Sequence, residues 1–391
     1  MPIEAFSNLF KDKDFRKIVI IFAICKIFVI VIAVGNQFFV PSEITHTEKV
    51  TDNIFLNPFA QYDATAYLYI AENGYTADFG GYHAANYHWY PLYPLMIRAL
   101  WFVGYPLSAF LIANIASFFA IMMLWILVRD EIGKRSASKT VIYMLLFPTA
   151  FYFTTMYTES LFLFLSVSMF YFAKKQNWLA VGIFGFLVSL SRMQGALLFI
   201  PIAYMYMRTV DFKLSKINRK VLYLLGIPVG LATFMFYEYL ITGDPLIQLK
   251  SAVLFGKQLS LPWTGFEFSL RAIFMDTTLI NVAYHVYTLL ITVAFIVLAY
   301  ISYKKLKHEY TIYYVLSLLI IIVSSNLFGA TRYFLMAFPA FMALSLIDDK
   351  NKFIKYGIIV VYVLFVLLMA GSIVLHVTER ISTPILYTPM F

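Results

Sequence analysis

Long apolar runs separated by short polar segments recur along the whole chain. A helix needs about 20 apolar residues to cross the hydrocarbon of a bilayer. Eleven runs approach that length: 18–40, 105–128, 140–157, 160–173, 178–191, 195–208, 220–241, 279–302, 311–328, 333–347 and 353–375. Four of them are short (160–173, 178–191, 195–208 and 333–347), and we expect interfacial aromatic residues to complete their ends. The pattern predicts an all-α polytopic membrane protein with about eleven transmembrane helices.

Composition favours a single integral-membrane domain over residues 1–391. Hydrophobic residues make up 61% of the chain and charged residues only 13%, whereas a soluble domain carries about 25% charged residues. A soluble fold of this length could not bury so much apolar surface. The net charge of +9 does not indicate nucleic-acid binding, because Lys and Arg are enriched in the cytoplasmic loops of membrane proteins.

The distribution of basic residues predicts the orientation. With the N-terminus placed inside, 21 of the 30 Lys and Arg residues fall in inner segments and 8 in outer ones. The pattern therefore predicts a cytoplasmic N-terminus. No small-residue cleavage site closes the first apolar run, so we expect an uncleaved span. The chain has no Asn-x-Ser/Thr sequon, which favours a prokaryotic cytoplasmic membrane over that of the endoplasmic reticulum.

Two outer loops, 41–104 and 242–278, are long enough to carry structure. In the first, apolar residues recur at helical spacing over 62–73, which predicts an amphipathic helix at the outer surface that ends at Gly74. The apolar stretch 95–103 that follows cannot be a further span without inverting all later loops, so we expect a re-entrant or interfacial helix. Because the structured loops lie outside, we expect the functional site there.

Two acidic residues stand at the outer ends of predicted helices. Asp63 begins the helix of the first outer loop, where it serves either as a helix-capping acid or as a general base with a pKa raised by its low-dielectric surroundings. Glu159 follows Thr158 at the start of a span. It is either a first-turn acid with Thr158 as cap, or a partner for sugar hydroxyls or an outer arginine.

Two arginines, Arg192 and Arg332, lie at outer membrane boundaries. They either snorkel toward lipid headgroups or bind a phosphate, for which the guanidinium group is well suited. Basic residues are scarce outside, which favours phosphate binding. His83 and His88 match no known spacing of metal ligands, and we expect surface histidines. The sequence has no glycine-rich phosphate loop or zinc pattern, so we expect no cofactor and no metal ion.

Three blocks carry a resemblance to a known family. The first runs from Gln61-Tyr62-Asp63 through Gly74-Tyr75 to Tyr90-Pro91-Leu92-Tyr93-Pro94-Leu95-Met96-Ile97-Arg98. The second runs from Phe147-Pro148-Thr149 to Glu159-Ser160-Leu161-Phe162, and the third is Ser189-Leu190-Ser191-Arg192-Met193-Gln194-Gly195. Arg332-Tyr333 with Phe338-Pro339 also fits. In order and spacing these blocks resemble the PIG-V-like mannosyltransferases, the family of the second GPI mannosyltransferase and its prokaryotic relatives. The family commonly has Trp where this chain has Tyr62, and often Phe where it has Tyr90.

The resemblance implies a GT-C glycosyltransferase that takes a sugar from a polyprenyl-phosphate carrier at the outer or luminal face. It implies Asp63 as the catalytic base in an inverting transfer of mannose. Arg192 and Arg332 would then stabilise the leaving phosphate. Further residues are expected to orient or line the sugar site: Glu159, Gln194, Tyr67, Tyr93 and Tyr333. The acceptor stays open among a glycolipid, a lipid-linked oligosaccharide and a protein hydroxyl.

Two other interpretations remain open from the sequence. A flippase or transporter of a lipid-linked sugar would carry ionisable residues near the bilayer midplane, where Lys26 and Glu238 come closest. An enzyme of the same architecture could instead use a different polyprenyl-phosphate sugar, such as a glucosyl or arabinosyl donor.

Overall fold

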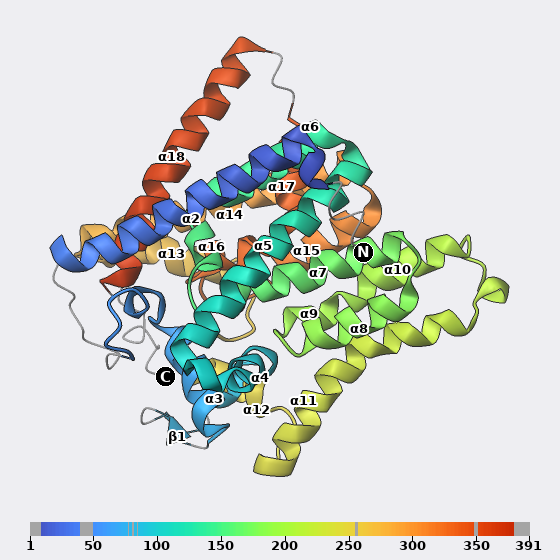
Figure 1. Cartoon of the computed structure of the whole chain (residues 1–391), viewed down its shortest axis with the longest axis horizontal. Coiled ribbons are helices and arrows are strands. Elements are labelled where there is room, and N and C mark those ends of the chain that lie inside the picture. Colours follow the sequence, from blue (N-terminus) through green and yellow to red (C-terminus); the bar gives the residue numbers. More distant parts are fainter. Residues whose placement is uncertain are drawn as a thin grey trace.

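The computed structural model describes residues 9–39, 50–76, 78–79, 82–83, 85–254, 257–347 and 351–378, and it is almost entirely helical (Figure 1). The α-helices are α2 (Lys13–Phe39), α3 (Asp63–Asn73), α4 (Leu92–Ala99), α5 (Tyr105–Ile132), α6 (Lys134–Leu146), α7 (Glu159–Lys174), α8 (Trp178–Ser189), α9 (Gln194–Leu197), α10 (Phe199–Thr209), α11 (Gly226–Thr242), α12 (Ile247–Leu254), α13 (Thr264–Met275), α14 (Leu279–Lys305), α15 (His308–Ile322), α16 (Ala330–Phe334), α17 (Phe338–Ser345) and α18 (Lys352–Val377). Short 3₁₀ helices are η1 (Asn57–Phe59), η2 (Ala85–His88), η3 (Trp101–Val103), η4 (Ala150–Phe153), η5 (Leu214–Lys216) and η6 (Arg219–Leu225). Two-residue strands β1 (Asp78–Phe79) and β2 (Tyr82–His83) pair antiparallel.

Five helices of the described chain are long and apolar enough to cross a membrane: α2, α5, the continuous η6–α11 segment, α14 and α18. The prediction of an all-α polytopic membrane protein is thereby confirmed. The other six predicted spans fall on shorter helices or on pairs of helices, so the count of eleven stays a prediction. The predicted span 140–157, for example, is not one continuous helix. α6 ends before Phe147, which takes an extended conformation (φ −57°, ψ 138°), because the residue before a proline is disfavoured in a helix.

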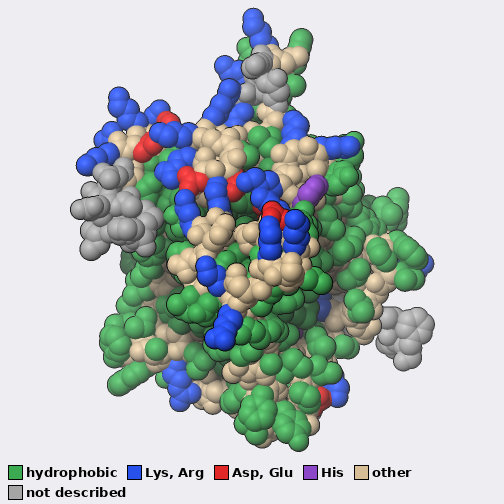
Figure 2. Space-filling model, turned by 90° about the vertical axis from the view of Figure 1, so that its right-hand side faces the viewer, with side chains coloured by type: hydrophobic (Ala, Val, Ile, Leu, Met, Phe, Trp, Pro, Cys, Tyr) green, Lys and Arg blue, Asp and Glu red, His purple; other side chains and the backbone are tan. Residues whose placement is uncertain are grey.

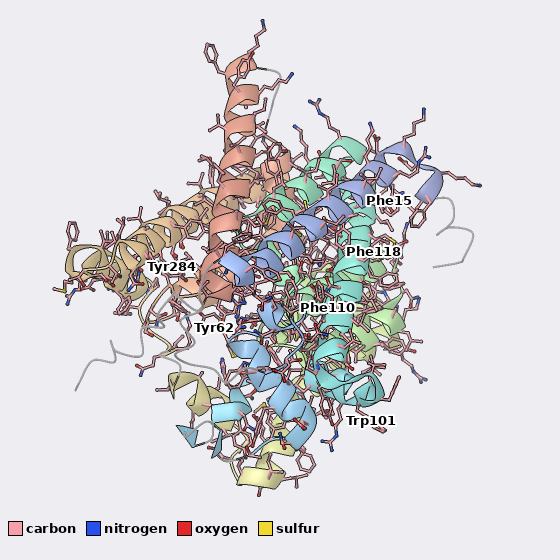
Figure 3. The ribbon with its side chains drawn as sticks, turned by 60° about the vertical axis from the view of Figure 1, so that its left-hand side comes forward. Phe15, Tyr62, Trp101, Phe110, Phe118 and Tyr284 are labelled. Carbon is pink, nitrogen blue, oxygen red and sulfur yellow. The ribbon has the colours of Figure 1, made fainter. Side chains whose placement is uncertain are left out.

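The centre of the molecule is built around α5 and α7. Most of the apolar window of α5 is buried inside the protein, whereas the windows of α2 and α18 are only 17% and 11% buried. Phe15 of α2 packs edge-on against Trp125 of α5, and Phe118 of α5 meets Phe22 of α2 (Figure 3). α18 projects from the body at one end (Figure 1), where its apolar side chains face outward. Such an all-round apolar surface is typical of a helix in contact with lipid.

Close packing of α8 against α11 depends on glycine. A Cβ atom on Gly230 would lie 2.4 Å from the carbonyl oxygen of Phe186, and one on Gly226 would lie 2.3 Å from that of Gly182. Distances under 3 Å cannot be accommodated, so only glycine permits this approach of two backbones. Small residues four positions apart are a common device for packing helices in membranes.

The predicted inner segments lie on one side of the molecule. Figure 2 shows Lys and Arg gathered over the upper part of one face, while its lower end is mainly hydrophobic. Ion pairs join segments far apart in the sequence: Asp12–Lys134 (2.6 Å), Glu131–Lys174 (2.7 Å), Glu131–Lys307 (2.6 Å) and Arg208–Glu309 (2.6 Å). The short helices of the first predicted outer loop lie at the opposite end, with α3, α4 and β1 together at the bottom of Figure 1.

Within that loop, α3 ends as predicted at Gly74, which has a φ of 81°. Six of the eleven side chains of α3 are buried, so much of the surface of this helix packs against the rest of the protein. The stretch predicted to be re-entrant or interfacial forms the short helices α4 and η3. Trp101 of η3 is 67% exposed and lies far from α18 (Figure 3).

Candidate active site

Four charged side chains from separate parts of the chain form one cluster, which we call the charge network: Asp63, Glu159, Arg192 and Arg332. Arg332 Nη1 donates a hydrogen bond to Asp63 Oδ2 at 2.7 Å. Arg192 Nη1 donates to Glu159 Oε1 at 2.8 Å. Arg332 Nε lies 3.0 Å from the same Oε1, as an ion pair without hydrogen-bond geometry. The network thus runs from Asp63 through Arg332 and Glu159 to Arg192.

The four side chains of the charge network differ in exposure. The side chain of Asp63 is 30% exposed, that of Arg332 is 14% exposed, that of Arg192 is 9% exposed, and that of Glu159 is fully buried. Asp63 is therefore the member that a substrate can reach most readily. Buried charges are tolerated when they are paired, and here each positive charge contacts a negative one.

The backbone before Asp63 holds an unusual conformation. Asp63 is the first residue of α3, and Tyr62 before it has φ 52° and ψ −122°. Non-glycine residues rarely adopt positive φ, and such conformations persist where the surrounding structure enforces them. The ring of Tyr62 packs on that of His376 at the end of α18, at a centroid distance of 5.2 Å (Figure 3). This packing fixes the start of α3 and with it the position of the Asp63 carboxylate.

The start of α7 places Glu159 between the arginines. Thr158 occupies the N-cap position, but its side chain makes no cap hydrogen bond, contrary to the one of the two alternatives in which it caps the helix. Thr158 Oγ1 instead accepts a hydrogen bond from Arg192 Nη1 at 2.8 Å and lies 3.3 Å from the hydroxyl of Tyr67. Glu159 Oε2 has no hydrogen-bond partner among the described residues, so one oxygen of this buried carboxylate is left available.

Arg192 lies in a tight connection between α8 and α9. Gly195 follows it so closely on α8 that a Cβ there would lie 2.2 Å from the carbonyl oxygen of Val188. The guanidinium of Arg192 stacks over the ring of Tyr333 at 5.2 Å. Its side chain points inward to Glu159, so the snorkelling interpretation of Arg192 is wrong.

Arg332 lies in α16 among aromatic rings. Its guanidinium carbon is 5.1 Å from the ring centroid of Tyr157, 5.3 Å from Tyr333 and 5.4 Å from Tyr152. Stacking on aromatic faces stabilises a desolvated cation. Arg332 therefore also points into the protein and does not snorkel.

The remaining predicted site residues differ in how they reach the charge network. Tyr333 contacts both arginines through its ring, and Tyr67 reaches Thr158. Tyr93 packs edge-on against Tyr67 at 5.3 Å, but its hydroxyl donates to the carbonyl of Ala109 at 2.8 Å. Tyr93 therefore contacts Tyr67 and not the charge network itself. Gln194 is half-buried in α9, and among the described residues no side-chain hydrogen bond or ion pair joins it to the charge network.

Sequence reasoning missed two residues beside the network. His376 is buried at the end of α18, with its ring against Tyr62 and Tyr152, and its Nε2 has no hydrogen-bond partner among the described residues. Lys257, in the second long outer loop, donates to the carbonyl oxygen of Phe328 at 2.6 Å. The available signal for Lys257 was its place among only eight basic residues in outer segments. No comparable signal marked His376.

The pKa of Asp63 differs from the sequence-based expectation. Burial raises the pKa of this carboxyl, but the charge and hydrogen bond of Arg332 outweigh burial and leave the pKa below its usual range. The prediction of a raised pKa is therefore wrong, because no sequence pattern pairs Asp63 with Arg332. Burial lowers the pKa of His88 to about 4 despite the nearby charge of Asp63. His88 is thus half-buried and neutral near pH 7, rather than a freely exposed surface histidine.

No group of three or more His, Cys, Asp and Glu side chains suited to hold a metal ion occurs in the described parts of the chain.

Comparisons with known proteins give similarity in structure only. No protein-family model and no curated protein matches the chain. Solved structures of the Archaeoglobus fulgidus oligosaccharyltransferase are similar to it. The apo form has 13% identity and a TM-score of 0.46, covering 93% of this chain and 56% of that one. The form tethered with an acceptor peptide has 14% identity and a TM-score of 0.44, covering 93% and 55%.

A third structure is that of the archaeal oligosaccharyltransferase AglB from Archaeoglobus fulgidus, in complex with an inhibitory peptide and a dolichol-phosphate. It has 14% identity and a TM-score of 0.43, covering 94% of this chain and 56% of that one. The chain spans about half the length of these proteins. The resemblance to the PIG-V-like family stays a prediction.

Proposed function

We propose that this protein is a GT-C-type membrane glycosyltransferase that transfers mannose from polyprenyl-phosphate-mannose to an acceptor hydroxyl. The observation that carries the proposal is the partly exposed carboxylate of Asp63, held by Arg332 at the edge of a buried charge network. A carboxylate that a substrate can reach, next to a cation that can meet a developing negative charge, is what glycosyl transfer from a lipid phosphate requires.

In the proposed reaction, the acceptor oxygen attacks the anomeric carbon of mannose and inverts its configuration. The acceptor proton passes to Asp63 Oδ. The bond between the anomeric carbon and the phosphate oxygen breaks, and its electron pair leaves with the polyprenyl phosphate. The phosphate then carries one more negative charge than it did in the donor. Arg332 is placed to stabilise that charge because its guanidinium already lies beside the Asp63 carboxylate.

The other members of the site take supporting roles. Arg192 is held by Glu159 and Thr158, so we assign it mainly to positioning Glu159. The available Oε2 of Glu159 is suited to accept a hydrogen bond from a sugar hydroxyl. Tyr67 and Tyr333 line the sugar site, with Tyr93 behind Tyr67, and Gln194 is a further candidate to orient the sugar.

Mannose as the transferred sugar rests on the sequence resemblance around Asp63, Glu159 and Arg192. A glucosyl or arabinosyl donor on the same carrier would use the same charge network. The acceptor, whether a glycolipid, a lipid-linked oligosaccharide or a protein, is the second substrate and the lipid bilayer is the surrounding medium.

We place the site on the extracytoplasmic face, in keeping with the basic residues gathered at the opposite end (Figure 2). Cysteine labelling tests this placement. In a Cys25→Ser background, Asn73→Cys in α3 should react with an impermeant maleimide added outside intact cells, and Ser215→Cys in η5 should not. Both positions are exposed. The reverse pattern would place the site on the cytoplasmic side.

The decisive test of function is sugar transfer by the purified protein. Radiolabelled polyprenyl-phosphate-mannose and a membrane-lipid extract are supplied to the wild type, to Asp63→Asn and to Glu267→Gln as a control. Glu267 is an exposed acid paired with Arg271. We expect transfer by the wild type and the control but not by Asp63→Asn. Full activity of Asp63→Asn would refute the assignment of the base, and no turnover with any polyprenyl-phosphate sugar would favour a transporter.

A further inference from the structure

The charge network by itself leaves no net positive charge for a phosphate. Two carboxylates, Asp63 and Glu159, face two guanidinium groups, Arg192 and Arg332, at 2.7 to 3.0 Å. A polyprenyl monophosphate that leaves as a dianion needs positive charge beyond this balance. Another cation close to the network would supply it.

Backbone pairing joins the segment of Lys257 to the segment that precedes α16. Ser325 N donates to the carbonyl of Gln258 at 2.9 Å, and Ser260 N donates to that of Val323 at 2.8 Å. An isolated antiparallel bridge between Leu259 and Ser324 lies between these bonds. Lys257 is thus tied to the segment that leads directly into α16, the helix of Arg332.

The ammonium group of Lys257 is held by neutral oxygens. Nζ donates to Asn326 Oδ1 at 3.1 Å and to the carbonyl oxygen of Phe328 at 2.6 Å. No carboxylate forms an ion pair with Lys257 within the described ranges of the chain. Two neutral acceptors orient the ammonium group and leave its charge unbalanced, as in a site prepared for an anion.

Lys257 is also electrostatically close to the charge network. Burial first, and then the positive charge of Arg332, lower the pKa of Lys257 to about 7, while Asp63 acts in the opposite direction. The Phe328 carbonyl oxygen that accepts from Lys257 Nζ lies four residues before Arg332, at the entry to α16. A phosphate that binds between two cations stabilises the charged form of both.

We propose that Lys257 and Arg332 together form the phosphate-binding site for the polyprenyl carrier, with Lys257 supplying the uncompensated charge. This inference rests on the proposed function for the identity of the carrier. It changes the roles predicted from the sequence: Lys257, rather than Arg192, is the second phosphate ligand. Because the leaving phosphate is held from the outer loop 242–278, that loop becomes part of the donor site.

Direct binding of the carrier tests the proposal without any sugar transfer. Short-chain polyprenyl phosphate is titrated into the protein in phosphatidylcholine nanodiscs, and the dissociation constant is measured by calorimetry. A hydrogen bond to a charged group corresponds to a roughly tenfold to hundredfold change in affinity. We expect Lys257→Met to weaken binding by that factor and Lys257→Arg to weaken it less.

The matched control is Lys250→Met. Lys250 lies in α12 of the same outer loop, but it pairs with Asp244 and is largely exposed, so its loss should leave the dissociation constant unchanged. Unchanged binding in Lys257→Met, or equal weakening in Lys250→Met, would overturn the proposal. Should Lys257→Met fail to fold, as judged by thermal unfolding, Lys257→Gln under the same titration decides between these outcomes.

Competition experiments identify which phosphate-bearing molecule the site binds. We expect inorganic phosphate to compete weakly with the carrier and phosphatidic acid in the nanodiscs to compete poorly. The contrary result is that phosphatidic acid displaces the carrier as effectively as free polyprenyl phosphate does, in a way that depends on Lys257. That result would assign the site to lipid headgroups in general and overturn the carrier assignment. Carrier binding that depends on Lys257 in a protein with no mannosyl transfer would leave the phosphate site standing and refute only the proposed sugar chemistry.

Discussion

Arg332 and Asp63 form a hydrogen-bonded ion pair at 2.7 Å although 269 positions separate them in the sequence. In this pair the guanidinium holds the pKa of the carboxyl below its usual range. A carboxylate stabilised in this way is a weak base. We infer that donor binding draws Arg332 toward the phosphate and thereby strengthens Asp63 as a base when the acceptor must be deprotonated.

The first prediction concerns the pH dependence of transfer. The profile of kcat/KM reports the free enzyme, and that of kcat reports the enzyme–substrate complex. Because Arg332 is shared with the phosphate only in the complex, we expect the acid limb of kcat to lie at higher pH than that of kcat/KM. Superimposed acid limbs would show that Arg332 does not move. The stabilisation of the fold by this pair is present above about pH 4, the pKa of an unfolded Asp, and is lost as the pH falls further.

The second prediction concerns Glu159, which is fully buried between two arginines. Glu159→Gln leaves Arg192 without a charged partner and Arg332 with Asp63 alone. Loss of one member of a buried pair costs about 3–5 kcal/mol. Thermal unfolding in detergent should therefore show a large drop in Tm. The exposed pair of Glu267 and Arg271 provides the control, since Glu267→Gln should change stability by under about 1 kcal/mol.

A double variant separates charge balance from packing at this position. Glu159→Gln with Arg192→Met removes one charge of each sign, so it should recover part of the stability lost in Glu159→Gln alone. A double variant as unstable as the sum of the two single variants would show that the two side chains act independently.

The third prediction concerns the connection that carries Arg192. Gly195→Ala would push a methyl group against the carbonyl of Val188, where a Cβ would lie only 2.2 Å away. Overpacking of this kind costs about 1–3 kcal/mol, and it should displace Arg192 and reduce kcat. Gly371→Ala in α18, where no atom outside the neighbouring backbone of the helix itself lies within 4 Å of the added carbon, should leave both Tm and kcat close to those of the wild type.

The fourth prediction follows from the pKa of Lys257, which burial and Arg332 lower to about 7. A neutral lysine cannot hold a phosphate dianion, so carrier affinity should fall as the pH rises above 7, by up to about tenfold per pH unit. Calorimetric titration between pH 6.5 and 9 measures this slope. Lys257→Arg should flatten it, because arginine stays charged throughout this range. A slope that is the same in both proteins would assign the titration to another group.

The sequence was informative where a local rule applied. Apolar runs predicted the long helices, Gly74 predicted the end of α3, and the scarcity of outer charges drew attention to Arg192 and Arg332. The ion pair between Arg332 and Asp63 could not be predicted, because no local sequence pattern connects these two residues. The same limit explains the wrong direction expected for the pKa of Asp63, since burial could be anticipated from its position but the compensating cation could not.

Lys257 illustrates a different limit. In the sequence it is one lysine in a polar loop, and Lys250 seven positions earlier looks equivalent. Only the pairing of 258–260 with 323–325 distinguishes them, and such pairing between distant loops has no periodicity that a sequence pattern could reveal. His376 was hidden in a similar way, as one polar residue at the end of an apolar helix.

The long separation between Asp63 and Arg332 also constrains how the protein is made. Synthesis at about 5–20 residues per second leaves roughly 13–54 seconds between the appearance of these two residues. During that interval the nascent chain has inserted Asp63, Glu159 and Arg192, so one carboxylate in the future site has no counterion. The half-made protein is therefore a distinct chemical species, with an unbalanced acid that water, lipid headgroups or an insertion factor must accommodate until α16 arrives.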